Sequence, residues 1–200
     1  MTKNPVKSST REKILGLAQH LIMRFGYNGF SYADISKQLK IKNAAIHYHF
    51  PVKADLVKAV VQGYTENFRN RLQEIDLNPA MGAAGKFDAY LAPFIQLSDS
   101  SIKICLCGAL AGEALSLPKK VRQETQVFFS VHEMWLTQFL ESGRKGKEFR
   151  FDGEASASAR LIFSALQGAL LAARVQQDTG YYQDIVNVLK NNLMKKPAGK

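Results

Sequence analysis

The sequence lacks most of the features that would mark a secreted protein or a membrane protein. Its 200 residues include only two cysteines, Cys105 and Cys107, too few for the disulfide framework of a small secreted domain. No apolar run reaches the roughly 18 residues that would predict a transmembrane helix. The polar start, MTKNPVKSSTREK, has no apolar segment of the kind found in secretory signals. We therefore expect a cytoplasmic protein with no membrane partner.

Motifs of catalysis and of cofactor binding are also missing. The sequence contains no HExxH, P-loop, GxGxxG or paired CxxC motif, and no Ser, His and Asp in an order typical of hydrolases. We expect no enzymatic activity, no cofactor and no metal site. A small helical enzyme with a fortuitous N-terminal motif is an alternative that would have to use Glu113, His132 and Asp152, but nothing in the sequence brings these residues together.

Apolar residues recur every three or four positions along most of the chain, and no segment alternates as a β-strand would. This pattern predicts an all-α fold. We expect a three-helix N-terminal domain at residues 1–52 and a C-terminal helical bundle at residues 53–200. The expected helices cover residues 9–25, 31–39, 43–50, 53–75, 85–98, 102–116, 118–142, 153–177 and 181–194.

The net charge of +10 is unevenly distributed along the chain. Residues 1–60 contain 10 Lys or Arg and 3 Asp or Glu, a net charge of +7, whereas residues 61–200 contain 17 and 14, a net charge of +3. Basic charge gathered in one third of a chain is suited to neutralising the phosphates of a nucleic acid. Charge alone is also compatible with a purely solubilising role.

Residues 30–50, FSYADISKQLKIKNAAIHYHF, have the outline of a helix-turn-helix. Ser31 and Asp34 form a capping-box pattern that would begin a first short helix. After a turn at residues 40–41, residues 43–50 would form the second helix, with small, polar and aromatic side chains on one face. In such a motif the second helix enters the major groove of DNA. The segment therefore predicts a DNA-binding protein.

Several side chains near the start of residues 43–50 are of types that contact DNA. Asn43 can pair with adenine, and Ala44 can contact a thymine methyl group. For His47 and His49, packing within the fold is the alternative, and metal binding by this pair is not expected because positions i and i+2 of a helix point apart. The candidate DNA contacts are Ser31, Tyr32, Lys42, Asn43, Ala44, His47, Tyr48 and Lys53, with Lys37 and His49 as weaker candidates.

Two segments, REKILGLAQHLIMRFGYNGFSYADIS at residues 11–36 and HYHFPVKADLV at residues 47–57, resemble the tetracycline-repressor (TetR) family of bacterial transcription regulators. The resemblance implies a homodimer that binds a palindromic double-stranded DNA operator, usually as a repressor, and is released by a small molecule in the C-terminal domain. A DNA-binding protein without such a ligand is the alternative. Lys40 stands where the family usually has Gly, so a turn that needs a positive φ would be strained there.

Residues 155–173, ASASARLIFSALQGALLAA, are apolar or small on nearly every side of the expected helix. Such a helix must be covered on more than one side, which its own body and a partner subunit could do together. With the apolar stripe of the last helix it would form a four-helix interface across a two-fold axis. A central helix in a monomeric bundle is the alternative. The stripe consists of Tyr182, Ile185, Val186, Leu189 and Leu193.

A ligand pocket in the C-terminal half would need apolar walls and a few polar groups. The candidates are Phe68, Phe94, Cys105, Phe128, His132, Trp135 and Gln167, with Tyr90 and Phe139 as further contributors. Residues 102–116, IKICLCGALAGEALS, resemble a branch of the TetR family in which a Cys-Leu pair precedes Gly, Leu-Ala and Glu. Some regulators with cysteines at this place respond to oxidants or electrophiles, so sensing through Cys105 or Cys107 is a further alternative. Burial in this apolar segment would instead favour inert thiols.

Overall fold

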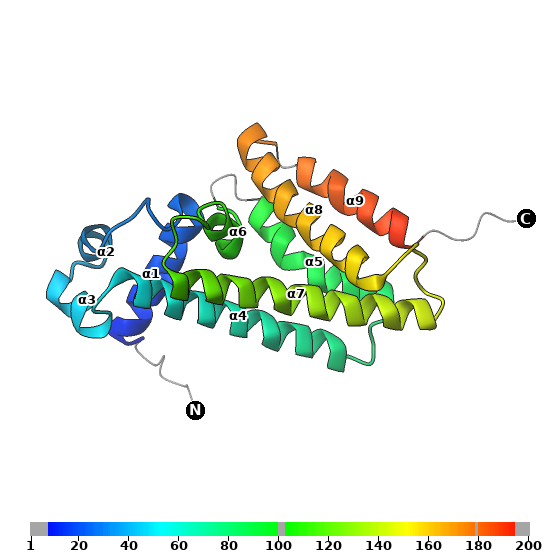
Figure 1. Cartoon of the computed structure of the whole chain (residues 1–200), viewed down its shortest axis with the longest axis horizontal. Coiled ribbons are helices and arrows are strands. Elements are labelled where there is room, and N and C mark those ends of the chain that lie inside the picture. Colours follow the sequence, from blue (N-terminus) through cyan, green and yellow to red (C-terminus); the bar gives the residue numbers. More distant parts are fainter. Residues whose placement is uncertain (1–7, 100–102, 179, 195–200) are drawn as a thin grey trace, which may run out of the picture.

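The computed structural model describes residues 8–99, 103–178 and 180–194, and in these ranges the chain forms nine α-helices and no strand. The first three helices make a head at one end of the molecule, and the other six described helices make an elongated body (Figure 1). The all-α prediction is confirmed. The helices are α1 (Thr10–Phe25), α2 (Tyr32–Leu39), α3 (Asn43–His49), α4 (Lys53–Leu77), α5 (Ala83–Ser98), α6 (Leu106–Ala111), α7 (Lys119–Lys145), α8 (Ala155–Gln176) and α9 (Gly180–Leu193).

The head forms because its helices have local start signals and share an apolar core. At α1 the backbone N–H of Ser9 donates to Glu12 Oε2 over 2.7 Å, and Ser9 Oγ accepts from Glu12 N over 3.2 Å. At α2 the backbone N–H of Ser31 donates to Asp34 Oδ2 over 2.7 Å, as the capping pattern predicted. The buried core shared by the three helices contains Ile14, Ala18, Ile22, Ile35, Ile46 and Phe50.

The turn between α2 and α3 contains a left-handed residue that is not glycine. Lys40 ends α2 with φ 54° and ψ 42°, and its backbone N–H donates to the carbonyl of Ser36. Ser36 Oγ donates in turn to the carbonyl of Ile41 over 2.6 Å, which holds the turn closed. The strain expected for a lysine at this position is therefore present, because the left-handed region costs an L-residue about 1–2 kcal/mol.

Lys40→Gly is expected to raise the free energy of unfolding by about 0.5–1 kcal/mol, since glycine adopts positive φ without a steric penalty. Lys37→Gly is the matched control, because it places glycine inside the same helix, where the loss should be about 1 kcal/mol. Urea unfolding of both variants at one protein concentration measures the two effects. A loss of stability in Lys40→Gly would show that this turn is not strained.

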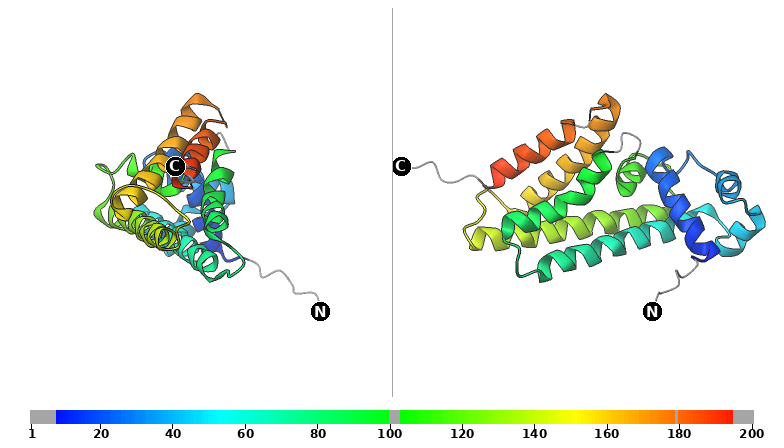
Figure 2. Two further views of the ribbon diagram at one scale, coloured as in Figure 1. Left: turned by 90° about the vertical axis from the view of Figure 1, so that its right-hand side faces the viewer. Right: turned by 180° about the vertical axis from the view of Figure 1, so that it is seen from behind.

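The helices α4 and α7 are the longest of the described chain and run side by side along the body, as all the views show (Figure 2). The proposed domain boundary coincides with the start of α4 at Lys53. The helix α1, however, packs against both α4 and α6, so that head and body share an interface. The division into residues 1–52 and 53–200 therefore stays a prediction about independent folding.

A proline inside α5 is compensated by a side chain of α4. Pro93 has no N–H, so the carbonyl of Ala89, four residues earlier, lacks its usual helical donor. Arg71 supplies one instead, because its Nη2 donates to the Ala89 carbonyl over 3.1 Å. The bond satisfies the helix and fixes α5 against α4.

In the segment predicted as one helix over residues 102–116, residue 102 lies outside the described residues, and residues 103–116 contain only the short helix α6, so this prediction was wrong in length. Cys105 stands at the N-cap and Gly112 at the C-cap of α6. Tight turns follow, in which Glu113 N donates to the Leu110 carbonyl over 3.0 Å and Ser116 N donates to the Glu113 carbonyl over 2.9 Å. The sequence pattern failed because the Glu113 side chain is bonded to the head, a contact between distant parts of the chain.

The helix α7 continues three residues beyond its predicted end at residue 142, and passes through Gly143 before Gly146 caps it. A Cβ atom at Gly143 would lie 2.0 Å from the ring of Phe149, so the glycine leaves room for the chain as it turns back toward α8. Glycine here serves close packing, whereas the sequence had suggested a helix end.

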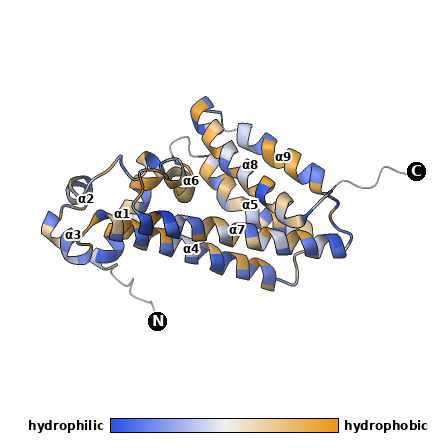
Figure 3. Cartoon of the chain, in the orientation of Figure 1, coloured by the Kyte–Doolittle hydropathy of each residue, from blue (hydrophilic) through white to orange (hydrophobic). Residues whose placement is uncertain are grey.

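Within the described ranges, α8 is the one helix long and apolar enough to cross a membrane by length and composition alone. It packs against α5, α7 and α9, as the core helix of a bundle does. Its outward side leaves Leu161, Leu171 and Val175 exposed by 67%, 46% and 80%, and hydrophobic residues lie along both α8 and α9 (Figure 3). The helix is therefore covered on one side by its own body and uncovered on the other.

The apolar stripe predicted for the last helix does not face outward as a whole. Tyr182, Val186 and Leu193 are buried in the chain's own body. The outward apolar groups of α9 are Tyr181 and Val188, exposed by 38% and 54%. The stripe was misassigned because both sides of α9 carry apolar residues, and the sequence alone does not say which side meets the body.

Candidate functional site

The helix α3 carries an exposed face of polar, small and aromatic side chains at the tip of the head. Lys42, directly before the helix, is exposed, as are Asn43, Ala44, His47 and Tyr48. Residues three or four positions apart on a helix are neighbours, so these side chains share one surface. Tyr48 is 84% exposed, so its ring and hydroxyl are free to contact a partner at this surface.

Two of the residues predicted to contact DNA, Tyr32 and Lys53, have polar side-chain ends that form hydrogen bonds inside the head. Tyr32 Oη donates to the carbonyl of Phe50 over 2.7 Å, and burial, followed by the charge of Asp55, raises the pKa of Tyr32 to about 12. Lys53 Nζ donates to the carbonyl of Phe30, and burial lowers the pKa of Lys53. Both side chains hold the head together, and direct contact with DNA stays a prediction for them.

The remaining predicted contacts of the head lie at its surface. Ser31 is exposed at the start of α2, where its Oγ donates to Asp34 Oδ2 over 2.7 Å, so a carboxylate already occupies the position that suits a phosphate. His47 Nδ1 lies 3.2 Å from the Pro51 carbonyl, and its ring meets that of Tyr32 edge-on with centroids 4.8 Å apart. Lys37 is exposed and His49 is half-buried.

A second candidate site lies inside the body, where most of the predicted ligand residues meet. His132 is fully buried, and its ring centroid lies 4.7 Å from that of Phe68, 4.4 Å from that of Phe128 and 5.8 Å from that of Phe94. Phe163 of α8 stacks on His132 with centroids 4.6 Å apart and planes 8° apart. We call these five residues, together with Tyr90, Cys105, Gln167 and Tyr182, the aromatic-polar cluster.

Three polar atoms of this cluster are buried without a hydrogen-bond partner among the described residues: His132 Nε2, Gln167 Nε2 and Tyr182 Oη. Tyr90 Oη lies 3.1 Å from His132 Nδ1, so either tautomer leaves Nε2 unpaired. Burial lowers the pKa of His132 to about 3, which keeps the imidazole neutral at physiological pH. Buried unpaired polar atoms are rare and costly, so three of them in one cluster make it a candidate site for a bound molecule.

The two cysteines are free thiols, and both are fully buried. Burial raises the pKa of Cys105, although neighbouring donors, the Gly108 backbone amide first among them, oppose the shift. Burial also raises the pKa of Cys107, as does the charge of Cys105. Tyr64 Oη lies 3.9 Å from Cys105 Sγ. Since the thiolate is the reactive form, this environment favours inert thiols.

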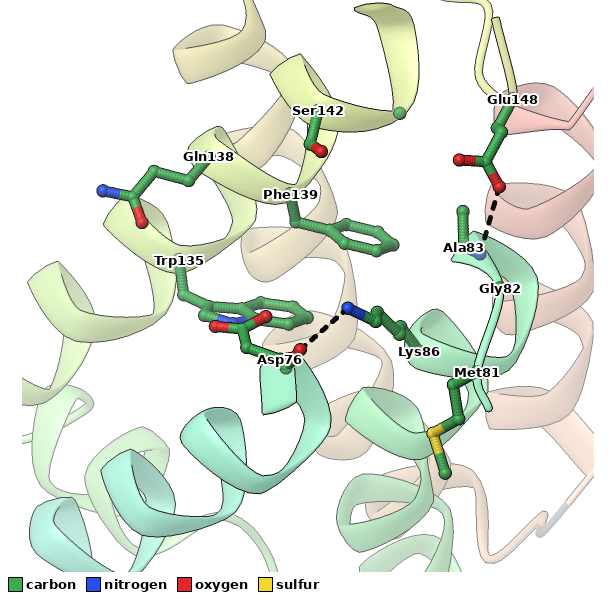
Figure 4. Close-up of a pocket in the computed structure, with 11 residues that line it drawn as sticks. Asp76, Met81, Gly82, Ala83, Lys86, Trp135, Gln138, Phe139, Ser142 and Glu148 are labelled. Carbon is green, nitrogen blue, oxygen red and sulfur yellow. Dashed lines mark hydrogen bonds between the residues drawn. The ribbon is translucent and has the colours of Figure 1, made fainter. Parts of the chain in front are cut away.

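The predicted ligand residue Trp135 lies at the edge of the cluster, between the core and a surface pocket of about 340 Å³ (Figure 4). Its indole stacks on Tyr90 with centroids 5.0 Å apart. In the pocket Trp135 Nε1 donates to Asp76 Oδ2 over 3.0 Å, and Lys86 Nζ donates to the Asp76 carbonyl over 3.0 Å. Asp76, Lys86 and Trp135 are thus already hydrogen-bonded to one another, unlike the unpaired atoms of the cluster.

Sequence reasoning missed two members of the cluster, Phe163 and Tyr182. Both lie on helices that the sequence analysis assigned to a dimer interface, so their role in the body was overlooked. The spacing of Phe163 and Gln167 on α8, four positions apart, was the available signal, because it places both side chains on one face.

Comparison with known proteins agrees with this arrangement. The family described as "Bacterial regulatory proteins, tetR family" matches residues 14–60, which include the helix-turn-helix. The family described as "Tetracyclin repressor-like, C-terminal domain" matches residues 84–189, more than half of the chain.

Solved structures and curated relatives extend the likeness over the whole length. A TetR-family regulator from Agrobacterium tumefaciens is 34% identical, with a TM-score of 0.87 over 92% of this chain and 97% of that one. A TetR regulator from Legionella pneumophila is 33% identical, with a TM-score of 0.85 over 93% and 98%. The transcriptional repressor NemR of Escherichia coli is 23% identical over 94% of this chain and 96% of its own length. The chain therefore belongs to the TetR family of bacterial regulatory proteins and is a ligand-responsive, DNA-binding transcriptional regulator.

Proposed function

We propose that the protein is a repressor that binds a palindromic operator as a homodimer, with the exposed face of α3 in the major groove. The observation that carries the proposal is the surface formed by Lys42, Asn43, Ala44, His47 and Tyr48, which offers an amide for adenine, a methyl group for thymine and a cation for phosphate. The proposed role is that of a transcriptional regulator, which the match to the TetR family models supports.

The homodimer would form through the outward sides of α8 and α9. Leu161, Leu171 and Val175 of α8 and Tyr181 and Val188 of α9 are apolar and exposed. An exposed apolar surface on two adjacent helices is suited to packing against its own copy across a two-fold axis. Such a dimer would place its two α3 helices in successive major grooves, about 34 Å apart.

Selection of random duplex DNA against the purified protein tests this function, and we expect a palindromic consensus.

With a duplex that carries this consensus, Asn43→Ala should weaken binding by about 10- to 100-fold and relax sequence preference at one position of each half-site. Lys42→Ala should weaken binding to all sequences, and the slope of the logarithm of the binding constant against the logarithm of the salt concentration should become less steep by about one. Lys145→Ala, which removes an exposed cation at the far end of α7, is the matched control and should bind as the wild type does. Binding that depends on salt but not on sequence would contradict the proposal.

The effector would bind in the aromatic-polar cluster and would be a neutral, ring-containing molecule with a hydrogen-bond acceptor such as a carbonyl oxygen. Aromatic walls suit a ring, and the unpaired Gln167 Nε2 offers donors. His132 is neutral, so the cluster has no charge to balance a carboxylate or an ammonium group. A groove of about 540 Å³ beside α7 is lined in part by Phe129, whose ring packs against that of Phe163 with centroids 5.2 Å apart, so the groove and the cluster are separated by one layer of side chains.

A further inference from the structure

A single carboxylate of the body holds the turn that joins α1 to α2 in the head. Glu113 Oε1 accepts from the backbone N–H of Tyr27 over 2.7 Å. Glu113 Oε2 accepts from the backbone N–H of Asn28 over 3.0 Å and from Asn28 Nδ2 over 2.5 Å. Asn28 Nδ2 also donates to Ser116 Oγ over 3.0 Å. Hydrogen bonds to a carboxylate are stronger than bonds between neutral groups, so this contact is a firm one.

The backbone of the turn is shaped to admit this carboxylate. Gly26 has φ 75°, and a Cβ atom at this position would lie 1.7 Å from Glu113 Oε1. No other residue type would allow so close an approach. The side chain of Lys53, at the start of α4, lies near enough for the charge of Glu113 to raise its pKa against the effect of burial. The turn, the start of α4 and the α6–α7 connection therefore meet at Glu113.

The end of α1 is bonded to the body at two further points. The backbone N–H of Ile104, just before α6, donates to the Met23 carbonyl over 3.2 Å. Arg174 of α8 donates from Nη2 to the Arg24 carbonyl over 2.6 Å. Carbonyl groups at the end of a helix need partners from outside it, and here the body provides them.

The other end of the same body segment borders the aromatic-polar cluster. Cys105 is the N-cap of α6 and lies 3.9 Å from Tyr64 Oη. A Cβ atom on Gly108 would lie 2.6 Å from Gln167 Oε1, so α6 rests directly against the cluster. Between these contacts and Glu113 there is only the short helix α6. The groove beside α7 is lined by Ala111 and Ala114, close to Glu113 in the chain.

We infer that Glu113 is the positioning residue through which α6 sets the orientation of the DNA-reading head. A molecule that enters the cluster displaces α6, the carboxylate withdraws from the amides of Tyr27 and Asn28, and α2 and α3 lose the orientation that fits two successive grooves. The inference rests on the proposed function, because it assumes that the head binds an operator. It assigns the coupling to one side chain.

The first experiment compares Glu113→Gln with Glu141→Gln, which changes an exposed glutamate of α7. Glutamine has one acceptor oxygen and would point an NH₂ group at the amides it must bind. We expect Glu113→Gln to weaken operator binding roughly tenfold, from the loss of hydrogen bonds to a charged group, and to speed amide exchange at Tyr27 and Asn28. Glu141→Gln should change neither. If Glu113→Gln does not fold, Asn28→Ala, which removes the side-chain donor alone, should weaken binding roughly threefold by the same reasoning.

The second experiment replaces the unidentified effector with a substitution that pushes on α6. Gly108→Val should press on Gln167 and weaken operator binding roughly tenfold in the wild-type background, but less than about twofold in the Glu113→Gln background, because coupled sites are not additive. Gly63→Val, on an open side of α4 with no neighbouring atom within 4 Å of a Cβ, is the control for valine in a helix. Lys42→Ala should remain additive with Glu113→Gln, since it acts directly on DNA.

Two results would overturn the inference: wild-type operator affinity in folded Glu113→Gln, or additive effects of Gly108→Val and Glu113→Gln. Either would show that Glu113 supports the fold without transmitting the position of α6. Failure of the proposed function looks different, because the wild-type protein itself would then select no operator.

Discussion

Phe128→Ala is expected to lower the free energy of unfolding by about 3–5 kcal/mol, the cost typical of truncating a buried aromatic side chain. Phe128 is fully buried, and its ring lies 5.4 Å from Tyr64, 5.5 Å from Phe68 and 6.2 Å from Phe163 between centroids. These rings belong to α4, α7 and α8, so the truncation would leave a cavity where three helices meet. Because the helices are held apart by many other contacts, the cavity cannot collapse fully.

Urea unfolding at a fixed protein concentration measures this loss. Phe25→Ala is the matched control, since Phe25 is 50% exposed at the end of α1 and its truncation should cost less than about 1 kcal/mol. Equal losses in the two variants would mean that the core around Phe128 is much less tightly packed than the ring distances indicate.

Acid is expected to destabilise the protein through His132. Its pKa is lowered from 6.5 to about 3 by burial, so between these values the unfolded chain binds a proton that the folded chain excludes. The contribution of neutral His132 to the free energy of unfolding is therefore fully present above pH 6.5, and it is lost as the pH drops toward 3. The slope is about 1.4 kcal/mol per pH unit, which amounts to about 2 kcal/mol by pH 5.

The measurement is urea unfolding at pH 7, 6 and 5, with His132→Leu as the variant that cannot titrate. The variant should lose about 2 kcal/mol less than the wild type between pH 7 and pH 5, whatever its stability at pH 7. Identical pH profiles for the two proteins would contradict the burial of a neutral imidazole in the cluster.

The head could be predicted from sequence because its signals are local. The capping pair Ser31 and Asp34 lies three residues apart, and the turn at Lys40 follows from a known place in a motif. The apolar residues of three short helices have one small core to fill. Each of these features is decided within a few residues, so their spacing alone identified the helix-turn-helix and the exposed face of α3.

Features decided by distant contacts were not predictable in the same way. The predicted helix over residues 102–116 includes Glu113, which lies in the turns after α6 and whose partners are 85 and 86 residues earlier in the chain. Gly143 seemed to end a helix, but it makes room for Phe149. Tyr182 has the spacing of an interface residue and faces the body. In each case the sequence shows the type of residue but does not show which distant residue it contacts, and that contact decides its role.

The candidate effector site was predictable from the sequence only in part. Phe68, Phe94, Phe128 and His132 were found because aromatic residues at helical spacing and one histidine among them stand out in a sequence. Phe163 and Tyr182 were not, since apolar residues on α8 and α9 can face either side. Which polar atoms stay unpaired is a property of packing alone, and only the structure could identify Gln167 Nε2 and Tyr182 Oη.

The bond between Glu113 and the head also has a consequence for protein synthesis. The head is synthesised first, whereas the partner of Tyr27 and Asn28 lies 86 and 85 residues further on, and the partner of Arg24 lies 150 residues further on. Domains generally fold in the order in which they are made. Here the end of α1 and the turn after it gain these partners only from later parts of the chain, so the bonds that join the head to the body can form only after residues 113 and 174 have been made.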